Sequence, residues 1–298
     1  MIISASRRTD IPHYYGDWLV NRMKEGFTLV RNPMNPRQIS RILLAPDKVD
    51  GFVFWTKNPA PFLKKLEAFR EYPYYFQFTL NGYGRGMEPG VPEEEEGSVD
   101  TFRRLSDIIG PDRILWRYDP ILIQKDFSLE YHGQAFERLS SKLEGYSGKC
   151  VISFVDYYKD ASKRMPLKSL DAREMDWIAQ TFSQIAKDRH FSLETCAEQI
   201  DLQKYGIKHG KCVDGSLLNS LSRRSFTVKP AAGQRGACGC DQSADIGAYN
   251  TCPSGCLYCY ANHQKVWLKE NLNRYNLQSP LLCGSVGPED RITQRKQP

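Results

Sequence analysis

The stretch "DGFVFWTKNPAPFLKKLEAF", residues 50–69, joins a strand pattern to a helical pattern, and this junction decides the fold class. Residues 50–56 form a short apolar run that predicts a buried strand. We expect Asn58 to be the N-cap of a helix and Pro59 its first residue. A helical apolar face follows, carried by Phe62, Leu66 and Phe69. A strand that leads directly into a helix predicts a parallel βα unit.

The same alternation continues toward both ends of the chain. Residues 98–109 and 171–187 carry apolar side chains at helical spacing, and Asp171 and Glu174 predict a capping box at the second helix. Residues 84–97, rich in glycine, proline and glutamate, predict a solvated loop. Further strands are expected at residues 1–6, 74–80, 113–118, 149–155 and 191–196. These patterns predict an α/β protein.

Composition narrows the class of protein. The chain has 298 residues, of which 41% are hydrophobic and 26% charged, values typical of a globular enzyme. It contains no secretory signal pattern and no apolar run long enough to span a membrane, so we expect a cytoplasmic protein without a membrane partner. The net charge of +6 gives weak support for a nucleic-acid partner. An odd number of cysteines, nine, favours metal binding over a disulfide framework.

Three of the cysteines lie close together in "CPSGCLYCY", residues 252–260. Cys252, Cys256 and Cys259 have the spacing C-x3-C-x2-C. Three thiolates can hold three corners of a [4Fe-4S] cluster and leave the fourth iron open. A zinc site, with His263 as a fourth ligand, is the alternative. The spacing, and the aromatic Tyr258 before the last cysteine, favour the cluster.

This segment resembles the radical S-adenosylmethionine signature, CxxxCxΦC, in which Φ is aromatic. Such enzymes usually carry the signature after the first strand of a barrel, whereas here it follows six predicted strands, which a circular permutation would reconcile. Segments "SRRTDIP" and "FWTKNP" are similar to those of spore-photoproduct-lyase-like members. With "WRYDPI", "TCAE" and "DIGAYNTCPSGCLYCYAN", nearly the whole chain resembles the DUF1848 family of proposed permuted radical enzymes.

The resemblance implies a partial (β/α) TIM-type barrel, circularly permuted so that the cluster-binding unit is C-terminal. Residues 1–275 would form this barrel, with strand-helix units in 1–190, an auxiliary cysteine segment in 191–242 and the cluster loop and a helix in 243–275. Residues 276–298 would form a tail. The implied cofactors are S-adenosylmethionine and one or two [4Fe-4S] clusters. The implied partners are an electron donor such as flavodoxin or ferredoxin and an unidentified substrate.

Four more cysteines come from three predicted loops. We expect them to bind an auxiliary cluster, because four thiolates suffice to ligate one fully. A structural zinc ion and unligated thiols are the alternatives. The four are Cys196, Cys212, Cys238 and Cys240. The remaining two, Cys150 and Cys283, are expected to be free thiols.

Polar residues follow the predicted strands at their carboxyl ends, where barrel enzymes place their active sites. We expect them to bind the sulfonium cofactor or an anionic substrate, with Tyr258 near adenine. They are Arg7, Arg8, Thr9, Asp10, Thr56, Lys57, Asn58, Arg117 and Asp119. Weaker candidates are Asp156, Tyr158, Glu194, Glu198, Gln234 and Arg235. Structural ion pairs, Arg8 with Asp10 and Arg117 with Asp119, and helix capping by Asn58 remain alternatives.

These observations predict a radical enzyme of unknown substrate that cleaves S-adenosylmethionine reductively. Two other functions stay open at this point. One is a zinc-binding structural or nucleic-acid-binding protein, in which the cysteines only hold loops together. The other is a nucleic-acid lesion repair lyase, which rests on analogy of fold alone.

Overall fold

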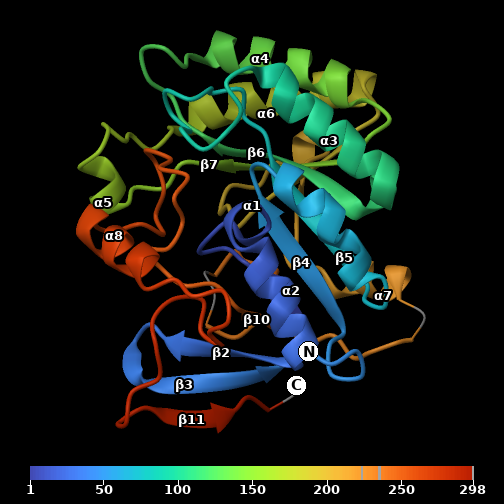
Figure 1. Cartoon of the computed structure of the whole chain (residues 1–298). Helices are drawn as coiled ribbons and strands as arrows, with labels where there is room; N and C mark the ends of the chain where they lie inside the picture. The colour runs from blue at the N-terminus through green and yellow to red at the C-terminus, as the bar shows by residue number, and fades with distance from the viewer. Residues whose placement is uncertain (223, 234–235, 297–298) are drawn as a thin grey trace.

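All six predicted strands belong to one parallel sheet in the computed structural model, which describes residues 1–222, 224–233 and 236–296. Within these residues the sheet has eight strands (Figure 1). In spatial order they are β10 (Ser243–Asp245), β1 (Ile2–Ala5), β4 (Gly51–Thr56), β5 (Tyr74–Thr79), β6 (Ile114–Ile121), β7 (Lys149–Phe154), β8 (Ser192–Thr195) and β9 (Lys208–His209). The α/β class is confirmed, and the parallel order with β10 and β9 at its edges is consistent with an open α/β barrel.

Helices cover one face of the sheet. Alternate side chains of each strand, such as Phe52 and Phe54 of β4, point into the large core beneath them, because strand side chains have a period of two. Figure 1 shows α3, α4 and α6 grouped together along β6 and β7. The helices are α1 (Ile11–Tyr14), α2 (Gly16–Glu25), the 3₁₀ segment η1 (Ala60–Phe69), α3 (Glu95–Ile109), α4 (Leu129–Leu143) and α6 (Ala172–Asp188).

The opposite face of the sheet is covered by residues 212–221, 226 and 238–240 instead of by long helices. On this face, the side chains farthest from the carboxyl ends of the strands are apolar, and they pack on Val213 and Leu218. This first layer contains Ile2, Val53, Tyr75, Leu115 and Val151. Residues two positions further along each strand point to the same face and form a second layer, nearer the carboxyl ends. This second layer is mostly polar. Its members Ser4, Trp55, Gln77 and Arg117 contact one another through hydrogen bonds and ring stacking.

The last strand of the sheet to appear in the sequence lies beside the first. β10 pairs in parallel with β1, with Ile2 opposite Ser243. The Asp245 carboxylate at the end of β10 accepts hydrogen bonds from the hydroxyls of Ser4 and Ser6 and from the backbone N–H of Arg7. β10 is short and polar, so it has no apolar run that would predict a strand. The pairing places the cysteine loop that follows β10 next to the end of β1.

A second, smaller sheet lies beside the main one. It consists of β2 (Phe27–Asn32), β3 (Asn35–Leu43) and β11 (Arg291–Gln294), in the order β11-β3-β2. Arg31 and Asp290 join its edges through an ion pair of 2.6 Å. The segment 276–298, expected as a tail, therefore contributes a strand. Across the described part of the chain, the helices all fall short of the length and apolar character that a membrane span requires.

Two helical boundaries differ from the prediction. η1 begins at Ala60 with Pro59 as its N-cap, and Asn58 accepts a side-chain hydrogen bond from the Ala60 N–H at 3.1 Å. α3 begins at Glu95, so part of the expected loop is helical. The capping box of Asp171 is confirmed. The remaining elements are η2 (Pro111–Arg113), α5 (Lys159–Ser162), η3 (Gln203–Tyr205), α7 (Gly215–Leu221) and α8 (Lys265–Asn273).

Candidate active-site cavity

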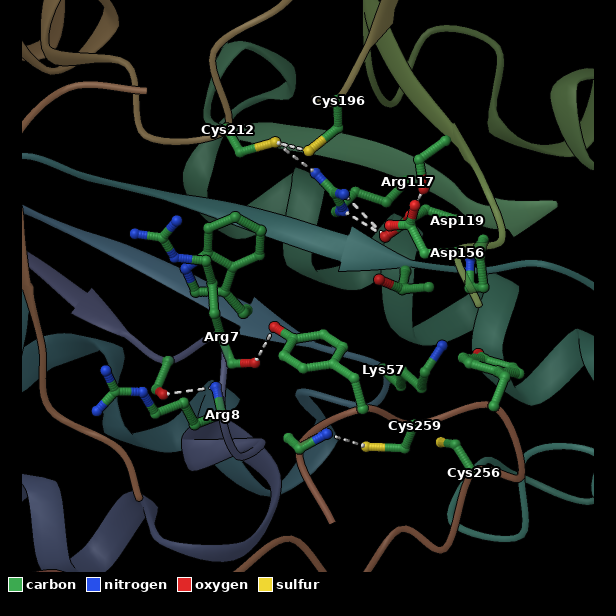
Figure 2. A pocket seen from close by; sticks show the side chains of 18 of the residues that line it. Arg7, Arg8, Lys57, Arg117, Asp119, Asp156, Cys196, Cys212, Cys256 and Cys259 are labelled. Carbon is green, nitrogen blue, oxygen red and sulfur yellow. Dashed lines mark hydrogen bonds and ion pairs between the residues drawn. The ribbon is translucent and has the colours of Figure 1, made fainter. Parts of the chain in front are cut away.

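A cavity of about 660 Å³ opens at the carboxyl ends of the strands. All seven cysteines expected as metal ligands line it, as does every residue expected to bind cofactor except Asn58. Its volume lies within the range of about 300–1,000 Å³ that is usual for small-molecule sites. Figure 2 shows Cys196 and Cys212 on one side of the view and Cys256 and Cys259 on the other. Residues far apart in the sequence therefore converge on one space.

The loop that carries Cys252, Cys256 and Cys259 is closed by two asparagines. The Asn262 side chain donates to the Cys252 carbonyl at 2.7 Å. Asn250 donates through its backbone N–H to the Ala261 carbonyl at 2.9 Å, and its side-chain oxygen accepts from the His263 N–H at 2.6 Å. Gly255 has φ +70°, a left-handed conformation that favours glycine. These contacts join the ends of the loop, so its three thiols face the same cavity.

Arg164 holds this loop from outside. Its guanidinium donates to the carbonyls of Leu257 at 2.9 Å and Asn262 at 2.7 Å, and also to that of Cys259. An arginine can do this because its five donors point in fixed directions within one plane. This role of Arg164 was not predicted, since nothing in its local sequence distinguishes it from a surface arginine.

A buried polar cluster lies beside Cys256. Lys57, at the end of β4, forms an ion pair of 2.8 Å with Glu88, and Glu88 also accepts from Asn81 at 2.9 Å and from the Tyr258 hydroxyl. Lys57 lies over the Tyr258 ring, 5.5 Å from its centroid. Glu88 is 2% exposed, so the prediction of a solvated loop is wrong at this residue. Composition alone does not reveal burial that depends on a lysine from a distant strand.

The segment after β1 lines the cavity with two arginines. Arg7 lies over the Trp55 ring at 5.8 Å, and Arg8 lies over the Tyr249 ring at 5.0 Å. Burial lowers the pKa of Arg7, but the nearby Asp245 and thiols outweigh it and raise that pKa. The Thr9 hydroxyl is buried and has no hydrogen-bond partner among the described residues.

Asp10 holds the backbone around the cavity. One carboxylate oxygen accepts from the His13 N–H at 3.0 Å, and the other accepts from the Lys57 N–H at 2.8 Å. The Asp10 carboxylate thus caps α1 and fixes the end of β4, whereas the sequence analysis expected it to bind cofactor or to pair with Arg8. Burial raises its pKa, and these backbone bonds oppose that rise. The neighbouring Thr56 hydroxyl accepts from the Asn58 N–H at 3.1 Å.

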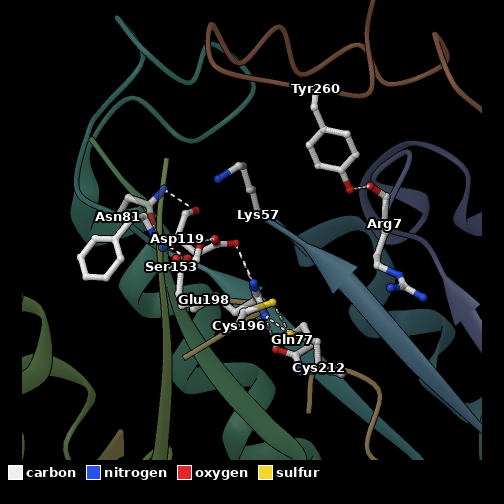
Figure 3. Close-up of polar contacts among 12 residues, drawn as sticks. Arg7, Lys57, Gln77, Asn81, Asp119, Ser153, Cys196, Glu198, Cys212 and Tyr260 are labelled. Carbon is white, nitrogen blue, oxygen red and sulfur yellow. Dashed lines mark hydrogen bonds and ion pairs between the residues drawn. The ribbon is translucent and has the colours of Figure 1, made fainter. Parts of the chain in front are cut away.

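Arg117 and Asp119 form an ion pair of 2.8 Å (Figure 2), and Asp119 also accepts a hydrogen bond from the Ser153 hydroxyl (Figure 3). Arg117 is 4% exposed and also donates to the Cys212 sulfur at 3.1 Å and to the Gln77 side chain at 3.3 Å. Burial acts to raise the pKa of Asp119, but the Arg117 guanidinium outweighs it and lowers that pKa. The alternative of a structural ion pair therefore holds for these two residues, which still line the cavity.

The four cysteines expected to bind an auxiliary cluster, called the inner cysteines below, have neighbouring sulfurs. They are Cys196, Cys212, Cys238 and Cys240. The Sγ atoms of Cys196 and Cys212 lie 2.7 Å apart, farther than the 2.05 Å or so of a disulfide bond. Cys212 also contacts Cys240, which in turn contacts Cys238. Hydrogen bonds from Cys212 lower the pKa of Cys196 and of Cys240 and raise that of Cys212 itself.

The outer thiols are those of Cys252, Cys256 and Cys259, and burial has the largest effect on the pKa of the first two. Burial raises the pKa of Cys252 to about 11 and that of Cys256 well above its ordinary value. The Cys259 sulfur accepts from the Ala261 N–H at 3.3 Å. Among the described residues, no three histidine, cysteine or acidic side chains are gathered as a single metal ion would require.

The weaker candidates differ in whether they line the cavity. Asp156, Tyr158 and Glu198 line the cavity, and burial raises the pKa of Glu198 to about 7. Glu194 pairs with Lys149 at 2.7 Å, away from the cavity lining. Gln234 and Arg235 lie outside the described residues. His263, the possible zinc ligand, contacts Asp160 at 3.1 Å and is not among the lining residues described.

Comparisons with known proteins give a family but no activity. The family described as a domain of unknown function, DUF1848, matches residues 2–261. No curated protein matches the sequence. Among solved structures, a proposed alpha-L-fucosidase from Bacteroides thetaiotaomicron shares 14% identity, with 72% of this chain and 80% of that chain covered. Its TM-score of 0.29 is too low to support any argument about function.

Proposed function

We propose that this chain, which belongs to the DUF1848 family, is a radical S-adenosylmethionine enzyme. The observation that carries the proposal is the position of Cys252, Cys256 and Cys259. Their C-x3-C-x2-C loop lines a cavity at the carboxyl ends of parallel strands, which is where α/β barrels place their chemistry. When bound there, a reduced [4Fe-4S] cluster would supply one electron to the sulfonium, giving methionine and a 5′-deoxyadenosyl radical that abstracts hydrogen from substrate.

The strand order supports a circular permutation of the barrel. The cysteine loop follows β10, which is late in the sequence but lies next to β1 at the edge of the sheet. In space, the sheet therefore begins with the strand that carries the loop and continues through β1, β4 and β5. A barrel whose cluster-bearing unit had moved from the front of the chain to its end would have this order.

The residues around the cavity supply binding and orientation. Arg8 presents a guanidinium without an ion-pair partner among the described residues, which suits a carboxylate of the cofactor or substrate. Lys57 is tied to Glu88, so it fixes the wall beside Cys256. The hydroxyl of the buried Tyr258 bonds Glu88, leaving its ring as an apolar surface in the lining.

The test is reductive cleavage of S-adenosylmethionine by the full chain. Protein reconstituted anaerobically with iron and sulfide, then reduced with dithionite, should release 5′-deoxyadenosine detectable by mass spectrometry. Cys256→Ala should abolish the product. Cys283→Ala is the matched control and should leave it unchanged, because Cys283 is a half-buried thiol outside the cavity.

Two results would count against the proposal. A wild-type protein that holds its full iron and yields no 5′-deoxyadenosine would exclude the radical reaction. A colourless protein that retains only zinc would favour the structural zinc alternative, because iron-sulfur clusters absorb near 400 nm and zinc-thiolate sites do not. Release of 5′-deoxyadenosine that depends on damaged nucleic acid would narrow the function to lesion repair.

A further inference from the structure

The four inner cysteines lie on rigid supports, which sets them apart from chance neighbours. Cys196 follows β8, and its N–H donates to the Ile152 carbonyl at 3.0 Å. The Cys212 carbonyl accepts from the Tyr75 hydroxyl at 2.7 Å and from the Gln77 side chain at 2.9 Å, both in β5. Two strands of the main sheet, β7 and β5, therefore position Cys196 and Cys212, whose sulfurs lie next to the polar layer of side chains on that face.

A buried carboxylate brings the third segment to the same place. Asp241, 1% exposed, accepts from the Gly215 N–H at 2.8 Å and pairs with Lys211 at 3.0 Å. These contacts join residues 238–241 to the segment around Cys212. The Cys240 sulfur also accepts from the Val213 N–H at 3.4 Å, a backbone-to-sulfur bond of the kind that stabilises thiolate ligands.

Two guanidinium groups face these sulfurs. Arg117 donates to Cys212 at 3.1 Å, and Arg7 lies close enough to Cys240 and Cys212 to interact with them electrostatically. Both arginines lie over the Trp55 ring, at 5.2 and 5.8 Å from its centroid. Figure 2 shows Arg117 beside Cys196 and Cys212.

The two guanidinium groups suit a negative group among the thiols. Each already has one carboxylate nearby, Asp119 for Arg117 and Asp245 for Arg7. Four thiolates around an iron-sulfur core carry a net negative charge. Two cations beside the thiols would lower the cost of placing that charge in a partly buried site.

We propose that Cys196, Cys212, Cys238 and Cys240 bind a second iron-sulfur cluster, whose negative charge is balanced by Arg7 and Arg117. This site is separate from the one held by Cys252, Cys256 and Cys259 and does not depend on the radical reaction. All four of its ligands come from the protein, so it has no open iron and is suited to electron transfer or to structure.

The test separates the two sites by metal content in the full chain. A variant with Cys252, Cys256 and Cys259 all changed to Ala should, after reconstitution with ferrous iron and sulfide, keep about four irons per chain, half of the wild-type value. The reconstituted variant should be brown. After reduction it should give the electron paramagnetic resonance spectrum of a reduced iron-sulfur cluster. Adding Cys212→Ser and Cys240→Ser should remove the iron, whereas adding Cys150→Ala, a buried core thiol, should not.

Reduction potential provides a second readout that leaves Cys196, Cys212, Cys238 and Cys240 unchanged. In the outer triple variant, Arg117→Gln should shift the potential of the remaining cluster to more negative values, because a positive charge beside a cluster favours its reduction. Arg113→Gln is the matched control, since Arg113 lies over Tyr74 at the other end of the sheet. An unchanged potential in Arg117→Gln would overturn the assigned role of this charge.

Three other outcomes distinguish the second cluster from its alternatives and from the radical function. An outer triple variant that is folded and holds no iron, or holds one zinc ion, overturns the proposal of a second cluster. Loss of two free thiols on air oxidation without any iron would identify Cys196 and Cys212 as a disulfide pair instead. A brown outer triple variant combined with a wild-type protein that fails to cleave S-adenosylmethionine would keep this proposal and reject only the radical function.

Discussion

Replacing Arg164 with methionine should loosen the cysteine loop while leaving the main sheet intact. The change removes three charge-assisted hydrogen bonds to the carbonyls of Leu257, Cys259 and Asn262. Fully buried bonds of this kind would together be worth roughly 5–9 kcal/mol. Because Arg164 is half-buried, water replaces part of each bond, and we expect the loop to open more easily by about 2–4 kcal/mol.

Hydrogen exchange of the loop amides measures this opening directly. The N–H groups of Leu257 and Cys259 are hydrogen-bonded to the Met87 and Cys256 carbonyls, so they exchange only when the loop opens. In the metal-free protein their exchange should accelerate by about 30- to 700-fold, since each 1.4 kcal/mol is tenfold. Lys163→Met is the control, because that exposed lysine pairs with Asp160 and makes no other ion pair among the described residues. Wild-type exchange rates in Arg164→Met would refute the reasoning.

Three further predictions concern stability, each measured by urea unfolding of the metal-free chain. Glu88→Gln leaves the Lys57 ammonium buried without its partner and should lower the free energy of unfolding by about 3 kcal/mol. Burial lowers the pKa of His132 to about 4, so as the pH falls this histidine is protonated in the unfolded chain before it is protonated in the folded one. Wild-type stability should therefore fall by roughly 3 kcal/mol as pH drops from about 6.5 to about 4, a slope that His132→Gln should remove. Gly247→Ala would place a Cβ atom 2.1 Å from the Ser6 hydroxyl and should cost about 1–3 kcal/mol, whereas Gly148→Ala, with open space around it, should not.

The strands were predictable wherever burial on both faces leaves a continuous apolar run. The run in residues 50–56 became β4, and the pattern in 171–187 became α6 with its capping box. β2 and β3 were missed because residues 27–43 contain two prolines and several polar residues. β10 was missed because only three residues pair, and their partner is at the other end of the chain.

The candidate site was predictable in its residues but not in its contacts. Motif spacing and the rule that barrel sites lie at strand ends identified the seven cysteines and the arginines that line the cavity. Glu88 and Arg164 escaped notice because their roles depend on contacts across long sequence separations. Asp10 was assigned to ligand binding, although both its oxygens hold backbone N–H groups, a distinction that needs coordinates.

The pairing of β1 with β10 has a consequence for synthesis of the protein. The ribosome releases Ile2 long before Ser243, so one edge of β1 stays without its neighbour while the residues between them are being made. The loop with Cys252, Cys256 and Cys259 emerges just after β10. A nascent chain therefore gains its outer thiols only when nearly all of the surrounding scaffold is available to receive them, and a prematurely terminated product lacks both the edge strand and the loop.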